Sequence, residues 1–474
     1  MKRTLLATLV VAASTGAHAI EPFDALSAPG TASNTNESTN PFVLPDGWTQ
    51  TLITDRNTLS GQAGFQSTFG NWDMVDVDPS GRYIYIPFEV QTGAGVARYD
   101  RVTGVSTTLM GGNNTGIFES DPTKWNHLND DFGAFDPAVL TPTGSLIVAE
   151  EWAGNGRIFE VHNPESAVDV SSSQVDWLSR VPSVSHEGLK FDNAGNLYFV
   201  DESNTGSIYK YVPRTAGDLS SGQTFVMSVD AFAGDAAANY NSADTRTGVA
   251  SWVAITDEVG NAITGADPFD FTTRGGRAAA DEVGGTPYGR PEDLEVGTLA
   301  NGNEVLFWAT TSENIVYGME LASDGSIVSV FEAVNSHTTP DSLGNNPVGE
   351  GGADDTYGLD DPDNLFVEYG PNGELQLFII EDENPGDIWM ATDADADGVA
   401  ELVELFASLG PFGSEPTGFI ADPLGGYLVN IQHPSSGNDA LWRIHQEVAP
   451  VPVPAAVWLF GSAMAGLVAR RKRS

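Results

Sequence analysis

The chain has 474 residues, with 65 Asp and Glu against 21 Lys and Arg, which gives a net charge of −44. This excess of acid excludes nucleic acid as a natural partner, because phosphate backbones are bound by Lys and Arg, and it favours divalent cations. The absence of cysteine excludes disulfides, thiolate metal sites and cysteine nucleophiles.

The first 19 residues have the pattern of a secretory signal peptide. Lys2 and Arg3 precede an apolar run over residues 5–13, and a small-x-small sequence ends at Ala19. We predict that residues 1–19 are removed on export. Residues 20–41 form a polar, flexible lead, and we expect the folded domain to occupy residues 42–446.

Six repeats within this domain predict its fold. In each repeat, a turn of Gly, Asn, Asp or Pro leads into a short run of β-forming residues that ends in acidic or polar side chains. The six runs cover residues 79–89, 142–151, 193–202, 301–313, 372–383 and 423–433. This pattern is typical of an all-β fold, the six-bladed β-propeller. Two Gly- and Asp-rich stretches, 214–288 and 335–360, interrupt the period and are predicted to be long loop insertions.

The polar strand ends and the loops that open the blades should meet at one mouth of the central channel. The candidates are Glu151, His186, Glu187, Asp201, Glu202, Glu292, Asp293, Glu313, Asp361, Asp363, Glu381, Asp382, Glu383, Glu415 and His433. Crowded carboxylates raise each other's pKa unless cations neutralise them, so this ring predicts a metal site. Oxygen ligands suit calcium or ferric iron better than soft metals. Arg290, directly before this acidic stretch, could hold a phosphate oxygen or pair with the neighbouring carboxylates.

A second metal motif is local in sequence. Asp393, Asp395 and Asp397, followed by Gly398 and then by Glu404, fit the Asp-x-Asp-x-Asp-Gly-x5-Glu pattern of calcium loops. No flanking helices are evident, so we expect a structural calcium-binding hairpin loop. The alternative interpretation is an acidic surface turn.

The end of the chain, residues 447–474, has the pattern of a sorting signal. The sequence Val-Pro-Val-Pro at 451–454 precedes an apolar segment over 455–469 and a basic cluster over 470–473. This tail resembles the PEP-CTERM signals, in a variant without the central Glu. The resemblance implies processing by an exosortase-type enzyme, membrane contact only through this segment, and a final location at the surface or extracellular matrix of a Gram-negative bacterium. A plain C-terminal anchor is the alternative.

Several blocks resemble the PhoX-type alkaline phosphatases, over about residues 70–445. The blocks are His186-Glu187, Asp201-Glu202, Arg290-Pro291-Glu292, residues 361–365 and, most specifically, residues 415–418 with 430–434. The resemblance implies a six-bladed propeller whose axial site holds calcium and iron and hydrolyses phosphate esters outside the cell. It further implies that Glu187 and Glu292 bind iron, that Arg290 grips phosphate, and that the residues around calcium are Glu151, Glu202, Asp363, Glu383 and Glu415.

One block departs from that family. Its Thr-Cys-Glu-Glu sequence is Val148-Ala149-Glu150-Glu151 here, and Ala149 replaces the cysteine that ligates iron. Alanine cannot coordinate a metal, so the sequence favours calcium and leaves Fe3+ open.

We therefore expect a secreted, monomeric, metal-dependent hydrolase of small phosphate esters, with Arg290, Glu292 and Glu187 as its catalytic residues. A non-catalytic calcium-binding surface or matrix protein is one alternative. Another propeller hydrolase, of lactonase or phytase type, is the other.

Overall fold

The computed structural model describes residues 23–27, 36–151, 156–232, 244–335, 339–342, 358–383, 386–411 and 413–447. The predicted signal peptide and residues 448–474 of the predicted sorting signal lie outside the described residues. Within the described part of the chain, no helix combines the length and the apolar character needed to cross a membrane.

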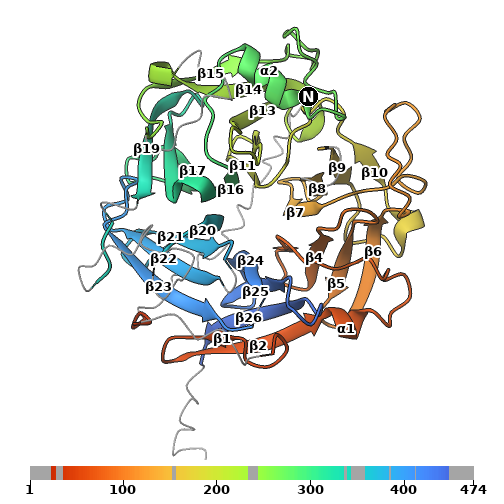
Figure 1. Cartoon of the computed structure of the whole chain (residues 1–474), viewed down its shortest axis with the longest axis vertical. Helices are drawn as coiled ribbons and strands as arrows, with labels where there is room; N and C mark the ends of the chain where they lie inside the picture. Colours follow the sequence, from red (N-terminus) through yellow and green to blue (C-terminus); the bar gives the residue numbers. More distant parts are fainter. Residues whose placement is uncertain are drawn as a thin grey trace, which may run out of the picture.

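Six antiparallel sheets stand around a common axis, as Figure 1 shows. The first sheet contains β3 (Asp76–Val77), β4 (Tyr83–Phe88), β5 (Gly95–Asp100) and β6 (Val105–Gly111), and the second contains β7 (Phe135–Leu140), β8 (Leu146–Glu150), β9 (Ile158–Val161) and β10 (Val175–Trp177). The third contains β11 (Leu189–Phe191), β12 (Leu197–Val200), β13 (Ile208–Thr215), β14 (Asp218–Val229) and β15 (Ala250–Ala254), and the fourth contains β16 (Pro291–Thr298), β17 (Glu304–Thr310), β18 (Ile315–Leu321) and β19 (Ile327–Asn335).

The last two sheets each take a strand from the N-terminal part of the chain. The fifth contains β20 (Pro362–Tyr369), β21 (Leu375–Glu381), β22 (Asp387–Asp393), β23 (Leu402–Leu409) and β1 (Phe42–Val43), and the sixth contains β24 (Glu415–Ala421), β25 (Tyr427–Gln432), β26 (Ala440–Gln446) and β2 (Trp48–Asp55). Because β2 pairs with β26, the start of the domain closes the ring against its end. This closure removes the open edge that an incomplete blade would present.

Each predicted run contributes the second strand of one blade. These strands are β4, β8, β12, β17, β21 and β25. The prediction of an all-β, six-bladed propeller is therefore confirmed. Apolar side chains of neighbouring blades pack together between the sheets, as Phe307 and Trp389 do between the fourth and fifth blades. The repeat of alternating apolar residues thus accounts for both the strands and the cores that hold them in a ring.

The stretch 214–288 is only partly a loop. It supplies all of β14 and β15 and the helix α2 (Gly275–Glu282), because apolar residues such as Leu219 and Val226 are buried between blades. The remaining short elements are α1 (Arg56–Leu59) and the 3-10 turns η1 (Val170–Ser172), η2 (Asp230–Phe232) and η4 (Thr311–Glu313). Most of the second predicted insertion, residues 343–357, lies outside the described residues.

Candidate active site

One acid stands at the start of the innermost strand of every blade. The six are Asp73, Asp136, Glu187, Glu292, Asp363 and Glu415. All except Glu292 line a single cavity of about 270 Å3 at one end of the channel. The propeller symmetry therefore gathers into one small space carboxylates that are far apart in the sequence.

A repeated backbone geometry presents these acids. In five blades the residue two positions before the acid has a left-handed backbone, with positive φ at Asn71, Ala134, Arg290, Asp361 and Gly413. In four of these blades the ladder of the inner strand then shifts register, in the segments 135–138, 291–294, 362–365 and 417–420. A β-bulge redirects side chains, and left-handed non-glycine residues are uncommon and strained. The same left-handed turn thus precedes five of the six inner acids, and four of those five turns are formed by residues other than glycine.

A second layer of polar side chains comes from the ends of the second strands. It comprises Glu89, Glu151, Glu202, Asp382, Gln432 and His433. The Nε2 atom of Gln432 joins the two layers, because it donates to Asp73 at 2.8 Å and to Glu89 at 2.6 Å. His433 lies at the exposed rim, with its Nε2 atom 3.5 Å from a carboxylate oxygen of Glu415.

Two groups of three carboxylates have the spacing of metal ligands. Glu151, Glu187 and Glu202 form one group, and Glu187, Glu292 and Asp363 form the other. Within each group, one oxygen per residue lies within 4.8 Å of the others. Since Glu187 belongs to both groups, the geometry suits two neighbouring cations that share a ligand residue.

The electrostatics of the ring favour the binding of protons or cations. Burial is the largest cause that raises the pKa of all six inner acids. Repulsion between neighbours adds to it: Asp363 and Glu292 raise the pKa of Glu187, and Asp73 raises that of Asp136. Without cations, these carboxyl groups retain protons well above their ordinary range.

Two buried carboxylate oxygens lack hydrogen bonds. Oδ2 of Asp136 and Oε2 of Glu292 have no hydrogen-bond partner in the described part of the chain. The other oxygen of Glu292 accepts the hydroxyl of Thr311. A buried charged oxygen without a partner is costly, and a bound cation would satisfy it. The donor set therefore fits a hard, oxygen-preferring metal.

Arg290 lies among these acids. Its Nε atom is 2.6 Å from Glu202 and 2.9 Å from Glu292, and its Nη1 atom is 2.9 Å from Asp382. The ion pair between Arg290 and the neighbouring Glu292, one of the two alternatives considered for this arginine, is therefore present. Among the described residues, Nη2 has no such partner, so one edge of the guanidinium is available to a ligand.

Several predicted candidates have structural roles instead. Asp201 pairs with Arg277, Glu313 accepts the backbone N–H of Gly289, Glu381 accepts the indole N–H of Trp389, and Asp293 accepts two backbone N–H groups. Glu383 does not line the cavity. It lies beside Asp361, and burial together with nearby acids raises the pKa of Asp361 to about 7.

His186 and Ala149 are both buried away from solvent. Neither ring nitrogen of His186 has a hydrogen-bond partner among the described residues, and its ring centroid is 5.1 Å from that of Phe199. Burial lowers the pKa of His186 to about 3, so it is neutral at physiological pH. Ala149 packs into an apolar cluster with Ile147 and Ile158.

The predicted calcium loop brings some of its acids together. Asp393, Asp395 and Glu401 offer oxygens within 4.8 Å of one another. Asp397 and Glu404 are not in that group, because Asp397 accepts the N–H of Val399 and Glu404 lies within β23. Sequence spacing did not identify Glu401 as a member of this group. Glu401 follows the turn, and its side chain accepts the N–H of Ala394 at the beginning of the turn.

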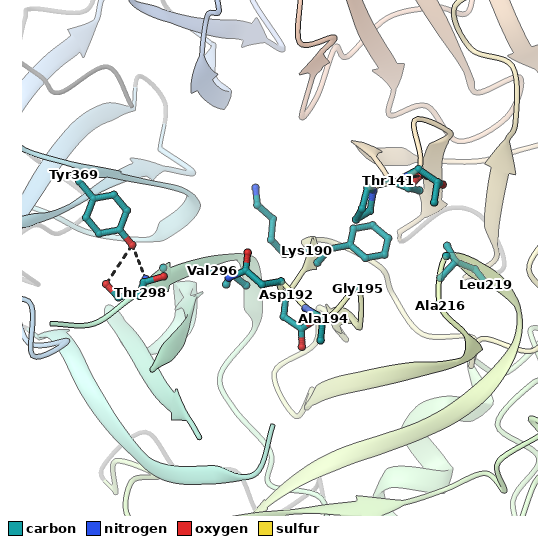
Figure 2. Close-up of a pocket in the computed structure, with 16 residues that line it drawn as sticks. Thr141, Lys190, Asp192, Ala194, Gly195, Ala216, Leu219, Val296, Thr298 and Tyr369 are labelled. Carbon is teal, nitrogen blue, oxygen red and sulfur yellow. Dashed lines mark hydrogen bonds between the residues drawn. The ribbon is translucent and has the colours of Figure 1, made fainter. Parts of the chain in front are cut away.

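The other end of the channel has a different character. A cavity of about 830 Å3 opens there, and Figure 2 shows Lys190 among its lining residues, with Tyr369 hydrogen-bonded to Thr298. The ammonium of Lys190 pairs with Glu295. A space of only about 70 Å3, lined by mainly apolar residues such as Leu189 and Phe419, lies farther inward and also borders Lys190.

The comparisons with known proteins agree with this architecture. The model of the family described as Alkaline phosphatase PhoX matches residues 107–435. A solved Pseudomonas fluorescens PhoX in complex with vanadate, a transition state analogue, is similar with a TM-score of 0.58 and 14% identity, over 90% of this chain and 98% of that chain.

Other solved structures are less similar. A putative phosphatase from Bacteroides thetaiotaomicron has a TM-score of 0.42 and 10% identity, over 80% of this chain and 72% of that one. A gluconolactonase from Xanthomonas campestris has a TM-score of 0.40 and 11% identity, over 89% of this chain and 99% of that chain. No curated protein matches the chain.

Proposed function

The chain belongs to the PhoX alkaline phosphatase family, and from that premise we propose that it is a secreted, metal-dependent phosphomonoester hydrolase with calcium in its acidic channel. The observation that supports this best is the pair of three-carboxylate groups that share Glu187 beside the guanidinium of Arg290. Metal cations and the planar guanidinium of an arginine both stabilise a phosphoryl group, and this cavity places candidate metal ligands beside Arg290.

The residues that would hold metal are Glu151, Glu187, Glu202, Glu292 and Asp363, because they form the two groups. Divalent cations held there would polarise the phosphoryl oxygens and position the attacking oxygen. Glu415 and Asp382, which line the same cavity, would complete the negative surroundings. We retain Fe3+ as a second candidate metal, although Ala149 offers it no ligand atom.

Arg290 would bind the phosphate through the edge that its three carboxylate partners leave open. Those partners fix the direction of the guanidinium before substrate arrives, so little conformational entropy is lost on binding. Because the charge on the transferred group is spread over its outer oxygens in the transition state, a fixed cation there contributes to rate as well as to affinity.

The size of the cavity limits the substrate. A volume of about 270 Å3 is slightly below the range usual for pockets that enclose a drug-sized ligand. It would admit a phosphoryl group and leave the alcohol part of the ester at the mouth. We therefore propose small phosphate esters as substrates, with weak selection for the alcohol.

Hydrolysis of p-nitrophenyl phosphate, measured beside metal content, tests the proposal. Wild-type protein should turn over the ester with calcium and lose activity on chelation. Glu292→Gln should abolish turnover, whereas Glu258→Gln, an exposed acid far from the site in sequence, should not. Wild-type protein with full metal content and no turnover would instead support the non-catalytic calcium-binding protein, which the apolar surroundings of Ala149 favour.

Two proposals concern the rest of the chain. Export through residues 1–19, and sorting to the cell surface or matrix through residues 447–474, would place the hydrolase outside the cell. Calcium at the loop of Asp393, Asp395 and Glu401 would stabilise the fifth blade, because the loop joins β22 to β23.

A further inference from the structure

A pocket with two tryptophans lies at the outer edge of the second blade, away from the channel. It is lined by Trp125, by Trp177 of β10 and by polar residues around them, and its volume is about 520 Å3. β10 is the outermost strand of its sheet, as Figure 1 shows. This pocket shares no lining residue with the acidic cavity of the proposed phosphatase site.

Both tryptophan rings are held from behind. The ring of Trp125 stacks on the buried Phe159, with centroids 5.4 Å apart and planes at 19°. The buried guanidinium of Arg157 lies 5.6 Å from the ring centre of Trp177. The two indole rings are 6.5 Å apart at 60° to each other. Each is half-buried and lines the pocket, so part of each indole is open to a ligand and its orientation is fixed by these contacts.

The rim of the pocket is polar and nearly neutral. Asn126, Asp176, Arg180 and Ser220 line it and are exposed. The lining holds one acid, Asp176, which pairs with His162, one base, Arg180, and the imidazole of His127, in a chain whose net charge is −44. This balance argues against an anionic or a cationic ligand, either of which would need an uncompensated charge of the opposite sign.

We propose that this pocket binds a neutral saccharide, as a short stretch of a glycan. A pyranose ring has an apolar C–H face that fits an indole ring and hydroxyl groups that need donors and acceptors at the edge. The two tryptophans supply the apolar contact for the C–H face, and the exposed polar residues of the rim supply the donors and acceptors for the hydroxyl groups. The volume lies within the range of pockets that enclose small ligands, so it has room for more than one sugar unit.

Affinity electrophoresis in native gels tests this with defined probes. Gels would contain a neutral glycan (dextran, pullulan or hydroxyethyl cellulose) or, for comparison, the anionic dextran sulfate. The wild-type protein should be retarded by at least one neutral glycan. Trp177→Ala should weaken the apparent affinity at least about tenfold, and Trp177→Phe less, because it keeps an aromatic face.

Two kinds of control separate binding from folding. Asp176→Ala and Asn126→Ala change exposed rim side chains without disturbing the core, and each should weaken retardation. Trp252→Ala removes a half-buried tryptophan on the third blade and should leave retardation unchanged. Glu292→Gln should also bind normally, since the inference does not depend on the phosphatase.

Three results would overturn the inference. The first is no retardation by any of the neutral glycans, and the second is retardation by dextran sulfate alone. The third is retardation that persists when Trp177→Ala and Asp176→Ala are combined. Quenching of tryptophan fluorescence by choline, without glycan binding, would assign the pocket to an organic cation and would equally overturn it.

Discussion

Arg290 has a backbone and a side chain that are both fixed by neighbours. Its φ of 55° is in the left-handed region, its N–H donates to the carbonyl of Ser203 at 3.0 Å, and its side chain pairs with three acids. Strain of this kind persists only where the surroundings impose it, and it concentrates at functional sites. Recognition of phosphate by Arg290 should therefore be separable from the binding of metal by the acids.

We predict that Arg290→Ala lowers kcat/KM for p-nitrophenyl phosphate by roughly 10- to 100-fold, the value of a lost charge-assisted hydrogen bond of about 1.5–3 kcal/mol. Metal content should be kept, because the substitution removes a positive charge from among the ligands. Arg290→Lys should be intermediate, since it keeps the charge without the fork. Loss of metal from Arg290→Ala would show that the arginine is structural.

Glu187 should matter more for metal than any other acid in the ring. It belongs to both three-carboxylate groups, whereas Glu202 and Asp363 each belong to one. Glu187→Gln should therefore lower the metal content of the purified protein more than Glu202→Gln or Asp363→Asn does. Elemental analysis after exhaustive dialysis measures this, and equal losses in all three variants would contradict the shared-ligand arrangement.

Some site residues were predictable from sequence and others were not. Glu187, Glu292, Asp363 and Glu415 follow from the resemblance and from their place at blade openings. Asp73 and Asp136 were missed because neither lies within the blocks that carry the resemblance. A signal did exist: Phe135-Asp136-Pro137 places an acid beside a proline, as Arg290-Pro291-Glu292 does, but the common left-handed turn two residues earlier is visible only in the backbone.

At the scale of elements, α2 fastens the loops that carry two of the acids. Arg277 of α2 binds the buried Asp201 with Nε at 2.5 Å and Nη2 at 2.7 Å. Asp201 also accepts the N–H of Ser185, two residues before Glu187, and it directly precedes Glu202. The stretch 214–288, predicted as an insertion, therefore helps to position Glu187 and Glu202 of the candidate metal site.

We predict that Arg277→Ala destabilises the protein by about 3–5 kcal/mol, because it leaves Asp201 charged and buried without its partner. Denaturant unfolding with calcium present would measure this. Arg82→Ala is the matched control: Arg82 pairs with Asp100 at the surface, where such a pair is worth at most about 1 kcal/mol. Asp201→Asn in the Arg277→Ala background should recover part of the stability, and no recovery would refute the charge explanation.

The Asp393 loop allows geometry to be tested against the sequence motif. The motif assigns the last ligand to Glu404, but β23 begins at Leu402, so Glu404 is held in the ladder opposite Met390. Glu401 is the acid that joins Asp393 and Asp395. Glu401→Gln should therefore reduce the rise in melting temperature that calcium gives, and Glu404→Gln should not. The reverse order would restore the motif assignment.

At the scale of the whole molecule, the fold could be predicted because one repeat encodes it six times. Each run combines a turn, an alternating strand and a polar end, so a misjudged boundary in one blade does not change the number of blades. The length of the third blade was misjudged because its fourth and fifth strands lie in an Ala- and Gly-rich stretch. Closure by β2 was also invisible, since pairing with β26 links the two ends of the domain.

At the same scale, we expect cations bound in the acidic ring to stabilise the whole propeller. A ligand that binds only the folded state stabilises it by about 2.7 kcal/mol at a hundredfold excess over Kd. We predict that chelation lowers the melting temperature by many degrees at neutral pH, with metal loss confirmed by elemental analysis. An unchanged melting temperature after complete metal loss would contradict the need for cations in the ring.

The effect of chelation should also depend on pH, with a defined sign. In the metal-free protein, the ring acids have folded-state pKa values above their unfolded values, and the pKa of Asp361, two residues before the ring acid Asp363, is raised from 3.8 to about 7. The folded state then binds more protons than the unfolded state between those values, so its stability is full at low pH and is lost as pH rises. The melting temperature in EDTA should fall between about pH 4 and pH 8, whereas with saturating calcium it should stay nearly constant, because the cation replaces the protons. A gap between the two curves that does not widen with pH would mean that calcium acts away from the carboxylate ring.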